Sequence, residues 1–397
     1  MTEQVETDFD AVVRIYRRLI PIKSISPASG GQGESKKADE ICKILEEMGY
    51  PNYNRYNFQD ENGFSRPNIV LKVGDKLRTL WIISHIDTVP EGSLDLWTRP
   101  PFATSVEGNK IYGRGSADNG EGIVSSLLIL KNLQKEKMKY NLGLAFVADE
   151  ETGSKYGIAK LLDSDIFNEK DLIVVPDSGT VEGNVIEVAE KSILWLKVVV
   201  NGKQGHASRP DLAVNASKLG MMFMLSIEKN LHEKFSASDP TFEYPLSTFS
   251  ITKHEKNVDN INTIPGKDTF YLDCRILPVY DLDSVMDYIK EEALKFSHTN
   301  NVKIEVTPYQ KEQAPPNTKT ASEVYTELSR AVKSVLNKEA KAVGIGGGTC
   351  AAFFRRRGIN AVVWGISVEE TYHQPDEYVI VDNVIKAAEV EEAMLYG

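Results

Sequence analysis

Three short apolar runs in the first half of the chain each end in acidic or imidazole side chains. The runs are RTLWIISH, NLGLAFVAD and DLIVVPD, and the polar groups at their ends are His85 and Asp87, Asp149 to Glu151, and Asp177. Helix-like stretches alternate with runs of this kind, as is typical of buried strands in an open α/β sheet. In such a sheet, ligands bind beyond the carboxyl ends of the strands. The pattern therefore predicts an α/β fold with a functional site at one edge of its sheet.

The alternation is interrupted in the middle of the chain. Between about residues 196 and 313, strand-like segments and two helical segments follow one another in an order typical of an α+β domain. From about residue 314 the alternation resumes, through the glycine-rich turn GIGGGT. Because 397 residues exceed the usual size of one hydrophobic core, we predict a discontinuous α/β domain formed by residues 1–195 and 314–397, and a smaller inserted domain of residues 196–313.

Composition narrows the range of partners. With 46 basic and 57 acidic residues the net charge is -11, which argues against a surface that binds nucleic acid or anionic lipid. The three cysteines, Cys42, Cys274 and Cys350, are too scattered for a disulfide framework and fit a reducing compartment. The acidic N-terminal segment has no signal pattern, and no apolar stretch approaches the roughly 18 residues of a membrane span. We expect a cytoplasmic protein without nucleic-acid or membrane partners, in which the basic run 355–357 is a solvated helix end.

The polar groups along the chain are of the types that bind zinc and similar metals. Such metals take imidazole and carboxylate ligands, and a pair of metals needs a carboxylate that bridges them. The candidates are His85, Asp118 in GRGSADNG, Glu150 and Glu151 in ADEETGS, Asp177 in VPDSG, and His373 in YHQPDE. Each residue alone is more often structural, as a satisfied histidine or a solvated turn. Gathered at one sheet edge, however, unpaired carboxylates are costly unless cations neutralise them.

Together these motifs resemble those of the dinuclear zinc amidohydrolases and exopeptidases of peptidase family M20. The family includes succinyl-diaminopimelate desuccinylase, acetylornithine deacetylase, aminoacylase-1 and carboxypeptidase G2. The resemblance spans most of the chain and rests on SHIDTVP, GRGSAD, DEETG, the later strand-end acid and HQPDE. It implies a zinc-exopeptidase-like fold, with a three-layer αβα catalytic domain and an inserted α+β lid or dimerisation domain.

The resemblance also implies a metal centre of two Zn²⁺ ions, with Co²⁺ or Mn²⁺ as alternatives. Asp118 would bridge the two ions. His85 and Asp177 would complete one site, and Glu151 and His373 would complete the other.

Catalytic roles follow from the same resemblance. Glu150 would be the general base, because it is adjacent to a ligand and is not needed as one. Asp87 would orient the imidazole of His85. His206, in GKQGHASRP, would reach across a homodimer to the partner's substrate carbonyl.

Four further residues would bind the free carboxylate of a small-molecule substrate. They are Asn262 in NINTIP, Arg275 in LDCRILP, and Gly348 and Thr349 in GIGGGT. Arginine suits this task because its planar fork pairs with both carboxylate oxygens, and a salt bridge within the inserted domain is its alternative role.

Two segments depart from the family pattern. The segment TCAAFF replaces the polar residues that follow this loop in the desuccinylase, which puts a succinyl substrate in doubt. After Asp118, Asn119 and Glu121 also replace the usual residues.

The sequence therefore predicts a metal-dependent hydrolase that cleaves an amide bond. N-acyl amino acid deacylation is the favoured reaction, and dipeptidase or carboxypeptidase action on short peptides is the alternative. A non-catalytic binding protein on the same scaffold is a more remote one, because all five ligand positions and the proposed base are present.

Overall fold

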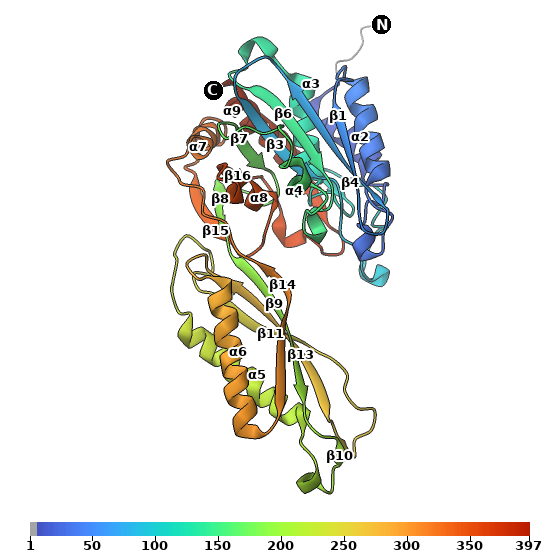
Figure 1. Ribbon diagram of the computed structural model, residues 1–397. Coiled ribbons are helices and arrows are strands. Elements are labelled where there is room, and N and C mark those ends of the chain that lie inside the picture. The colour runs from blue at the N-terminus through green and yellow to red at the C-terminus, as the bar shows by residue number, and fades with distance from the viewer. Residues whose placement is uncertain (1–5) are drawn as a thin grey trace. The chain divides into compact units, whose positions relative to one another are not determined.

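The computed structural model describes residues 6–397, which form two compact units (Figure 1). The first unit comprises the described residues up to Val188 together with Asn317–Val343 and Thr349–Gly397. The second comprises Ala189–Pro316 and Gly344–Gly348. The boundaries expected from the sequence lie a few residues away, and the glycine-rich loop 344–348 groups with the second unit.

The first unit is built on an eight-stranded mixed sheet with the strand order β1-β2-β6-β3-β7-β16-β8-β15. The strands are β1 (Asn54–Gln59), β2 (Ser65–Val73), β3 (Thr79–His85), β6 (Asn141–Val147), β7 (Leu172–Val175), β8 (Val185–Glu190), β15 (Lys341–Ile345) and β16 (Ala361–Val363). Strand β3 pairs in parallel with both β6 and β7. The carboxyl ends of these three strands therefore meet at one edge of the sheet.

Helices cover both faces of this sheet. They are α1 (Asp8–Leu19), α2 (Ser35–Glu47), α3 (Gly120–Asn132), α4 (Ile158–Leu161), α7 (Glu323–Leu336), α8 (Cys350–Arg356) and α9 (Val381–Tyr396). Helices α1, α3, α7 and α9 pack on one another as one layer. Alternate side chains of the central strands, such as Trp81 and Ile83, pack instead against α4 and α8. The result is the predicted αβα arrangement.

The residues at the two ends of α1 stabilise this helix. In α1, Thr7 caps the helix by accepting a hydrogen bond from the backbone N–H of Asp10. Acidic residues lie in its first turn and arginines in its last turn, which complements the helix dipole.

Strands β3, β6 and β7 are buried along their whole length, as expected for central strands covered on both faces. A small sheet of β4 (Ser105–Glu107), β5 (Lys110–Tyr112) and β17 (Tyr378–Ile380) completes the unit.

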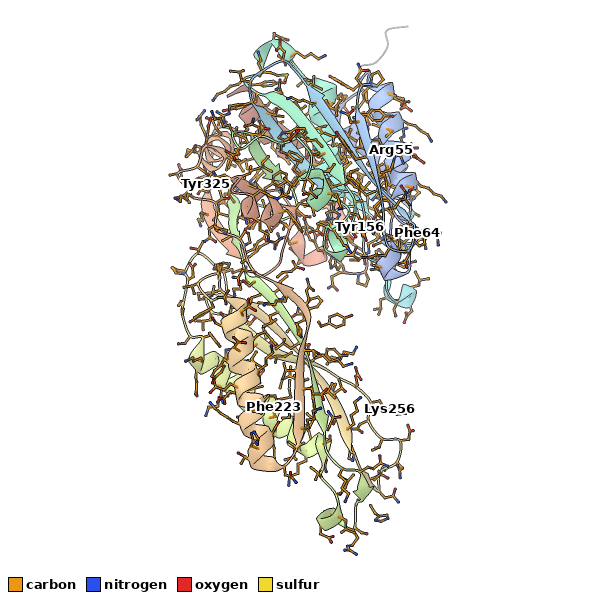
Figure 2. All side chains as sticks on the ribbon, in the orientation of Figure 1. Arg55, Phe64, Tyr156, Phe223, Lys256 and Tyr325 are labelled. Carbon is orange, nitrogen blue, oxygen red and sulfur yellow. The ribbon has the colours of Figure 1, made fainter. Side chains whose placement is uncertain are left out.

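The second unit is a four-stranded antiparallel sheet with two helices. The elements are β9 (Ser192–Asn201), β11 (Thr248–His254), β13 (Lys267–Ile276), β14 (Lys303–Glu312), α5 (Ala216–Lys234) and α6 (Leu282–Asn300). Along β9, buried and half-buried residues alternate, and the buried set packs in one core with residues of α5 and α6. Phe223 of α5 belongs to this core (Figure 2). A two-stranded antiparallel sheet of β10 (Gly205–His206) and β12 (Thr263–Ile264) belongs to the same unit.

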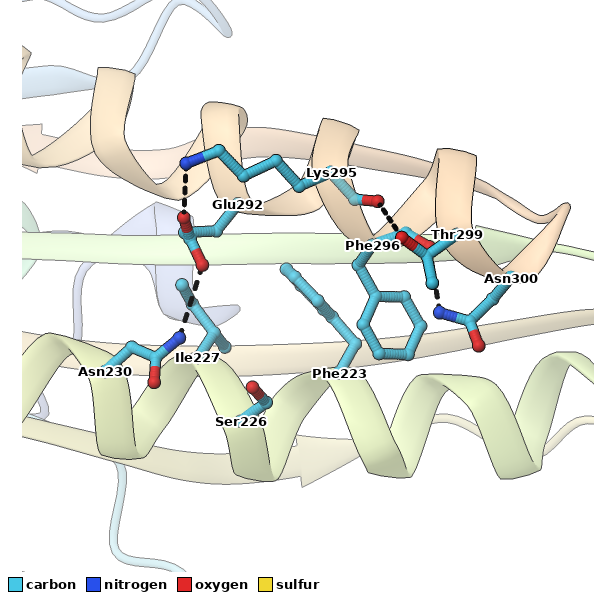
Figure 3. Close-up of a pocket in the computed structure, with 9 residues that line it drawn as sticks. All are labelled: Phe223, Ser226, Ile227, Asn230, Glu292, Lys295, Phe296, Thr299 and Asn300. Carbon is cyan, nitrogen blue, oxygen red and sulfur yellow. Dashed lines mark hydrogen bonds and ion pairs between the residues drawn. The ribbon is translucent and has the colours of Figure 1, made fainter.

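A pocket of about 180 Å³ lies between α5 and α6 (Figure 3). Within it, Glu292 accepts hydrogen bonds from Asn230 at 3.2 Å and from Lys295 at 3.0 Å. Phe223, Ile227 and Phe296 contribute the apolar part of its lining.

The expectation that the basic run 355–357 is solvated is wrong for Arg355. This side chain is buried, and its Nη1 lies 3.0 Å from Oε1 of Glu187. A buried guanidinium needs such a partner because an unpaired charge is costly to bury.

Close packing in the central sheet leads to a stability prediction. A Cβ atom at Gly143 in β6 would overlap the ring of the buried Trp81. We therefore expect Gly143→Ala to lower the free energy of unfolding by about 1–3 kcal/mol, the usual cost of overpacking. Chemical denaturation measures the change, with Gly347→Ala as the control because nothing lies within 4 Å of a Cβ there. Equal stability of the two variants would contradict the prediction.

Candidate metal centre

The carboxyl ends of β3, β6 and β7 carry the side chains that the sequence analysis singled out. His85 is the last residue of β3, and Asp177 follows β7. Glu150 and Glu151 begin the short 3₁₀ turn that follows β6. Asp118 precedes α3 and completes the group at this edge with a carboxylate from a different part of the chain.

One trio of potential ligands consists of His85, Asp118 and Asp177. Nε2 of His85 lies 2.8 Å from Oδ1 of Asp118 and 3.3 Å from Oδ1 of Asp177. Asn119 donates a hydrogen bond of 2.9 Å to the same Asp177 oxygen. His85 is buried, and Asp177 is half-buried.

A second trio consists of Asp118, Glu151 and His373. Nε2 of His373 lies 3.0 Å from Oδ2 of Asp118 and 3.3 Å from Oε2 of Glu151. His373 is the most open member, with its side chain 51% exposed. The two trios therefore share Asp118, which uses a different oxygen toward each imidazole.

Asp87 holds this edge of the sheet together. Its two carboxylate oxygens accept hydrogen bonds of 3.1 Å from the backbone N–H groups of Glu150 and Glu151. Its backbone oxygen lies 3.1 Å from Nδ1 of His85. This contact leaves Nε2 of the imidazole directed toward Asp118 and Asp177.

Glu377 was not singled out by the sequence analysis, although it is the last residue of the HQPDE motif. It is fully buried and accepts hydrogen bonds from the backbone N–H groups of Gly115, Ala117 and Asp118 and from the Arg114 side chain. These bonds attach the segment that carries His373 to the segment that carries Asp118. The sequence signal was its place in the motif, but its partners lie more than 250 residues away.

Several carboxylates lie close together in this metal centre, and their burial and mutual charge shift the pKa values of its residues. Burial, reinforced by the charge of Asp118, raises the pKa of Glu151 to about 7. Burial and the neighbouring Asp177 charge raise the pKa of Glu150 well above its usual range. Hydrogen bonds to Asp118 and then to Glu151 raise the pKa of His373 to about 10. For Asp118, burial favours the neutral acid, but hydrogen bonds with the two histidines outweigh burial and lower the pKa.

The arrangement fits divalent metal ions. Imidazole and carboxylate are the ligand types of zinc and its neighbours, and each trio combines one imidazole with two carboxylates. Within the part of the chain that the structure describes, Oε1 of Glu151 is buried without a hydrogen-bond partner. An unpaired buried carboxylate oxygen is costly, and a cation would satisfy it.

The remaining predicted residues belong to other parts of the fold. His206, Asn262, Arg275 and Gly348 lie in the second unit, whereas Thr349 caps α8 in the first by accepting a hydrogen bond of 3.1 Å from Ala351 N–H. In the second unit, His206 is exposed, and its Nδ1 lies 2.7 Å from Oγ of Ser208.

Arg275 is paired within the second unit. Its Nε lies 2.8 Å from Oδ1 of Asp273, and its Nη1 donates to the backbone oxygen of Gly346 at 3.1 Å. The salt bridge that the sequence analysis weighed as an alternative role is therefore present. Asn262 is exposed, and its backbone oxygen accepts from Ala207 N–H at 2.9 Å.

A model of the peptidase family M20/M25/M40 matches residues 81–396. The chain belongs to this family. A metallohydrolase of Methanocaldococcus jannaschii is 43% identical, with 96% of this chain and 98% of the relative covered. A succinyl-diaminopimelate desuccinylase of Buchnera aphidicola is 25% identical, with 97% and 98% covered. The crystal structure of aminopeptidase PepT from Bacillus cereus has a TM-score of 0.76 at 18% identity, with 98% of each chain covered.

These comparisons confirm several predictions from the sequence. The family, the αβα fold with a smaller second domain, and the assignment as a metal-dependent hydrolase are all confirmed. No helix among the described residues is long and apolar enough to span a membrane.

The shared carboxylate leads to a prediction about metal binding. We expect Zn²⁺ added to metal-free protein to raise the midpoint of thermal unfolding, because a ligand that binds only the folded state stabilises it. Asp118→Ala removes a member of both trios, so the zinc-dependent rise should disappear. Glu151→Ala should remove only part of it. Differential scanning calorimetry with and without zinc measures both effects, and an unchanged rise in Asp118→Ala would contradict the shared role.

Proposed function

We propose that the protein hydrolyses the amide bond of a small substrate that bears a free carboxylate, at a centre of two Zn²⁺ ions. The observation that carries the proposal is the pair of trios that share Asp118. A single buried carboxylate directed at two imidazoles from opposite oxygens suits a bridging ligand better than a structural ion pair. Co²⁺ and Mn²⁺ accept the same ligand types and are alternatives.

The ligand residues would divide into two sites. His85 and Asp177 would hold one ion, Glu151 and His373 the other, and Asp118 both. When bound, such a pair of ions lowers the pKa of a water molecule and polarises a carbonyl group.

Glu150 is the proposed general base. Its backbone is held by Asp87, which places it beside the ligands without making it a member of either trio. Its carboxylate would take a proton from the attacking water and deliver it to the leaving amine. Asp87 would serve as the residue that fixes the orientation of His85.

For the substrate, we propose an N-acyl amino acid whose acyl group is released by hydrolysis. The similarity to a desuccinylase over nearly the whole chain supports this class. Arg275, Asn262, Gly348 and Thr349 are the proposed carboxylate-binding residues, with Arg275 exchanging the Asp273 carboxylate for that of the substrate.

Peptidase action on dipeptides or short peptides is the second candidate. The observation that favours it is the apolar start of α8, where Cys350, Ala351 and Ala352 are all buried. These residues offer no polar side-chain group to a charged acyl chain. The similarity to an aminopeptidase fold is compatible with either class.

We further propose a homodimer in which His206 acts on the substrate bound by the partner. His206 is exposed on the short β10 strand, and Met221, Met222 and Leu225 form an exposed apolar face on α5. An exposed apolar face of this kind is typical of a protein interface. The three cysteines are free thiols, which supports the proposed cytoplasmic location.

The chemistry is tested with Glu150→Ala. We expect this variant to retain both ions and to lose nearly all turnover, because it lacks the proposed proton acceptor and keeps every proposed ligand. Amine release is measured across N-succinyl, N-acetyl and dipeptide substrates, and metal content by atomic absorption. Preference for an N-acyl amino acid would support deacylation, and turnover of dipeptides alone would support the peptidase.

Two outcomes would count against the proposed base. If Glu150→Ala turned over substrate like the wild type, another group would have to accept the proton. If the variant lost its metal ions, Glu150 would be a ligand. Glu61→Ala is a matched control, because Glu61 is an exposed glutamate of the same unit.

The cross-subunit role of His206 is tested by mixing two inactive subunits. We expect His206→Ala and Glu150→Ala homodimers each to be nearly inactive. A mixed dimer would contain one site with both an intact Glu150 and an intact His206 from the partner, so activity should return when the two are mixed under conditions that exchange subunits. Mixtures that stay inactive, although analytical ultracentrifugation with labelled subunits shows exchange, would refute the role.

A further inference from the structure

Tyr372 links the loop of His373 to helix α3. It immediately precedes His373 in the chain, and its hydroxyl donates a hydrogen bond of 3.2 Å to Oε1 of Glu121. The same hydroxyl is hydrogen-bonded to Oγ of Ser367. Glu121 lies in the first turn of α3, three residues after Asp118. The contact therefore joins the segments that carry two of the proposed ligands.

The fold leaves room for the Glu121 carboxyl group and buries it. Glu121 is only 5% exposed, and a Cβ atom at Gly365 would lie 3.2 Å from its Oε1. Among the described residues, its Oε2 has no hydrogen-bond partner, and the side-chain nitrogen of Asn383 has none either. Both residues line a cavity of about 10 Å³, which is close to the room that one water molecule needs. A buried acid of this kind needs a reason beyond packing, because its burial is costly.

The backbone of His373 also requires support. Its φ of 60° lies in the left-handed region, which is uncommon for residues other than glycine. Such a conformation persists only where the surroundings enforce it. On one side, Arg114 donates to the His373 backbone oxygen at 3.3 Å, and Glu377 accepts from Asp118 N–H at 3.1 Å. On the other side, the side chain of Tyr372 is the anchor.

We propose that Tyr372 and Glu121 are positioning residues that hold His373 at its distance from Asp118, and thereby set the affinity of the ion bound by Asp118, Glu151 and His373. This inference rests on the proposed two-ion function. It also gives a role to Glu121, one of the two positions after Asp118 at which the chain departs from the family pattern. Partners behind a metal ligand commonly act in this way, by fixing the orientation of the ligand.

The test is a titration of metal-free protein with Zn²⁺, measured by calorimetry with a competing chelator. We expect the wild type to bind two ions. The ion whose affinity falls in His373→Ala is the one that depends on this loop. Tyr372→Phe keeps the ring and removes the hydroxyl. It should therefore lower the binding affinity of that same ion by roughly 10–100-fold and leave the affinity of the other ion unchanged. Tyr325→Phe, a half-buried tyrosine of α7 (Figure 2), controls for loss of a hydroxyl outside the network.

A double-mutant cycle shows whether the two residues act through one hydrogen bond. Glu121→Leu should lower the binding affinity of the same ion. The double variant Glu121→Leu, Tyr372→Phe should bind this ion no more weakly than the weaker-binding single variant. Glu121→Gln keeps an acceptor for the tyrosine and should restore most of the affinity. This rescue distinguishes positioning from a general loss of structure, which circular dichroism of each metal-free variant measures separately.

The outcomes separate the inference from the function on which it rests. A wild type that binds fewer than two ions would overturn the two-ion centre and this inference with it. A wild type that binds two ions with affinities that Tyr372→Phe leaves unchanged would overturn the inference alone. An equal loss of affinity for both ions in Tyr372→Phe would also overturn it, because the hydrogen bonds of Tyr372 would then stabilise the first unit as a whole and not the position of His373.

Discussion

The structure depends on one carboxylate that faces two imidazoles. Asp118 lies 2.8 Å from the ring of His85 and 3.0 Å from that of His373, and further carboxylates crowd the same edge. Burial, reinforced by the neighbouring carboxylates, raises the pKa values of Glu150 and Glu151. Although burial of His85 opposes it, the neighbouring carboxylates raise the pKa values of both imidazoles and so favour their positive charge. Divalent cations would supply the balancing positive charge more effectively and would release the imidazoles to act as neutral ligands.

Placing these groups together requires loops that are held as firmly as strands. The chain achieves this with buried carboxylates that accept backbone N–H groups: Asp87 holds the turn after β6, and Glu377 holds the segment before α3. A third case is Asp149, whose Oδ2 accepts a hydrogen bond of 2.9 Å from the backbone N–H of Tyr156. Bonds of this charge-assisted kind are stronger than neutral ones. They therefore suit segments that have no strand partner but must not move.

The sequence predicted the parts of this design that leave a local pattern. Strands β3, β6 and β7 appeared as apolar runs, and the polar residue at each end indicated the site because parallel strands end at the same edge. Strands β1, β2, β8 and β15 were not predicted. The partial burial of β1, in which exposed residues predominate, explains why its sequence lacks a clear apolar run.

Contacts between distant segments could not be predicted in this way. Arg355 was expected in solvent because it begins a run of three arginines, but Glu187 meets it in the interior. Tyr372 has the same difficulty, since nothing in its neighbourhood along the chain indicates Glu121, which lies 251 residues away. The role of a buried polar residue depends on the group with which it pairs. A periodic pattern in the sequence does not indicate which distant residue that group belongs to.

The residues of the proposed function are divided between the two units. All of the proposed ligands and the proposed base belong to the first unit, whereas Arg275, Asn262 and His206 belong to the second. Arg275 is already paired with Asp273, so a substrate carboxylate would have to compete with Asp273 for it. Under the proposed function, substitutions in the second unit would change which substrate carboxylate is bound and would leave the ligands of the metal centre unchanged. This is the physical reason that the family resemblance identifies the reaction class more securely than the substrate.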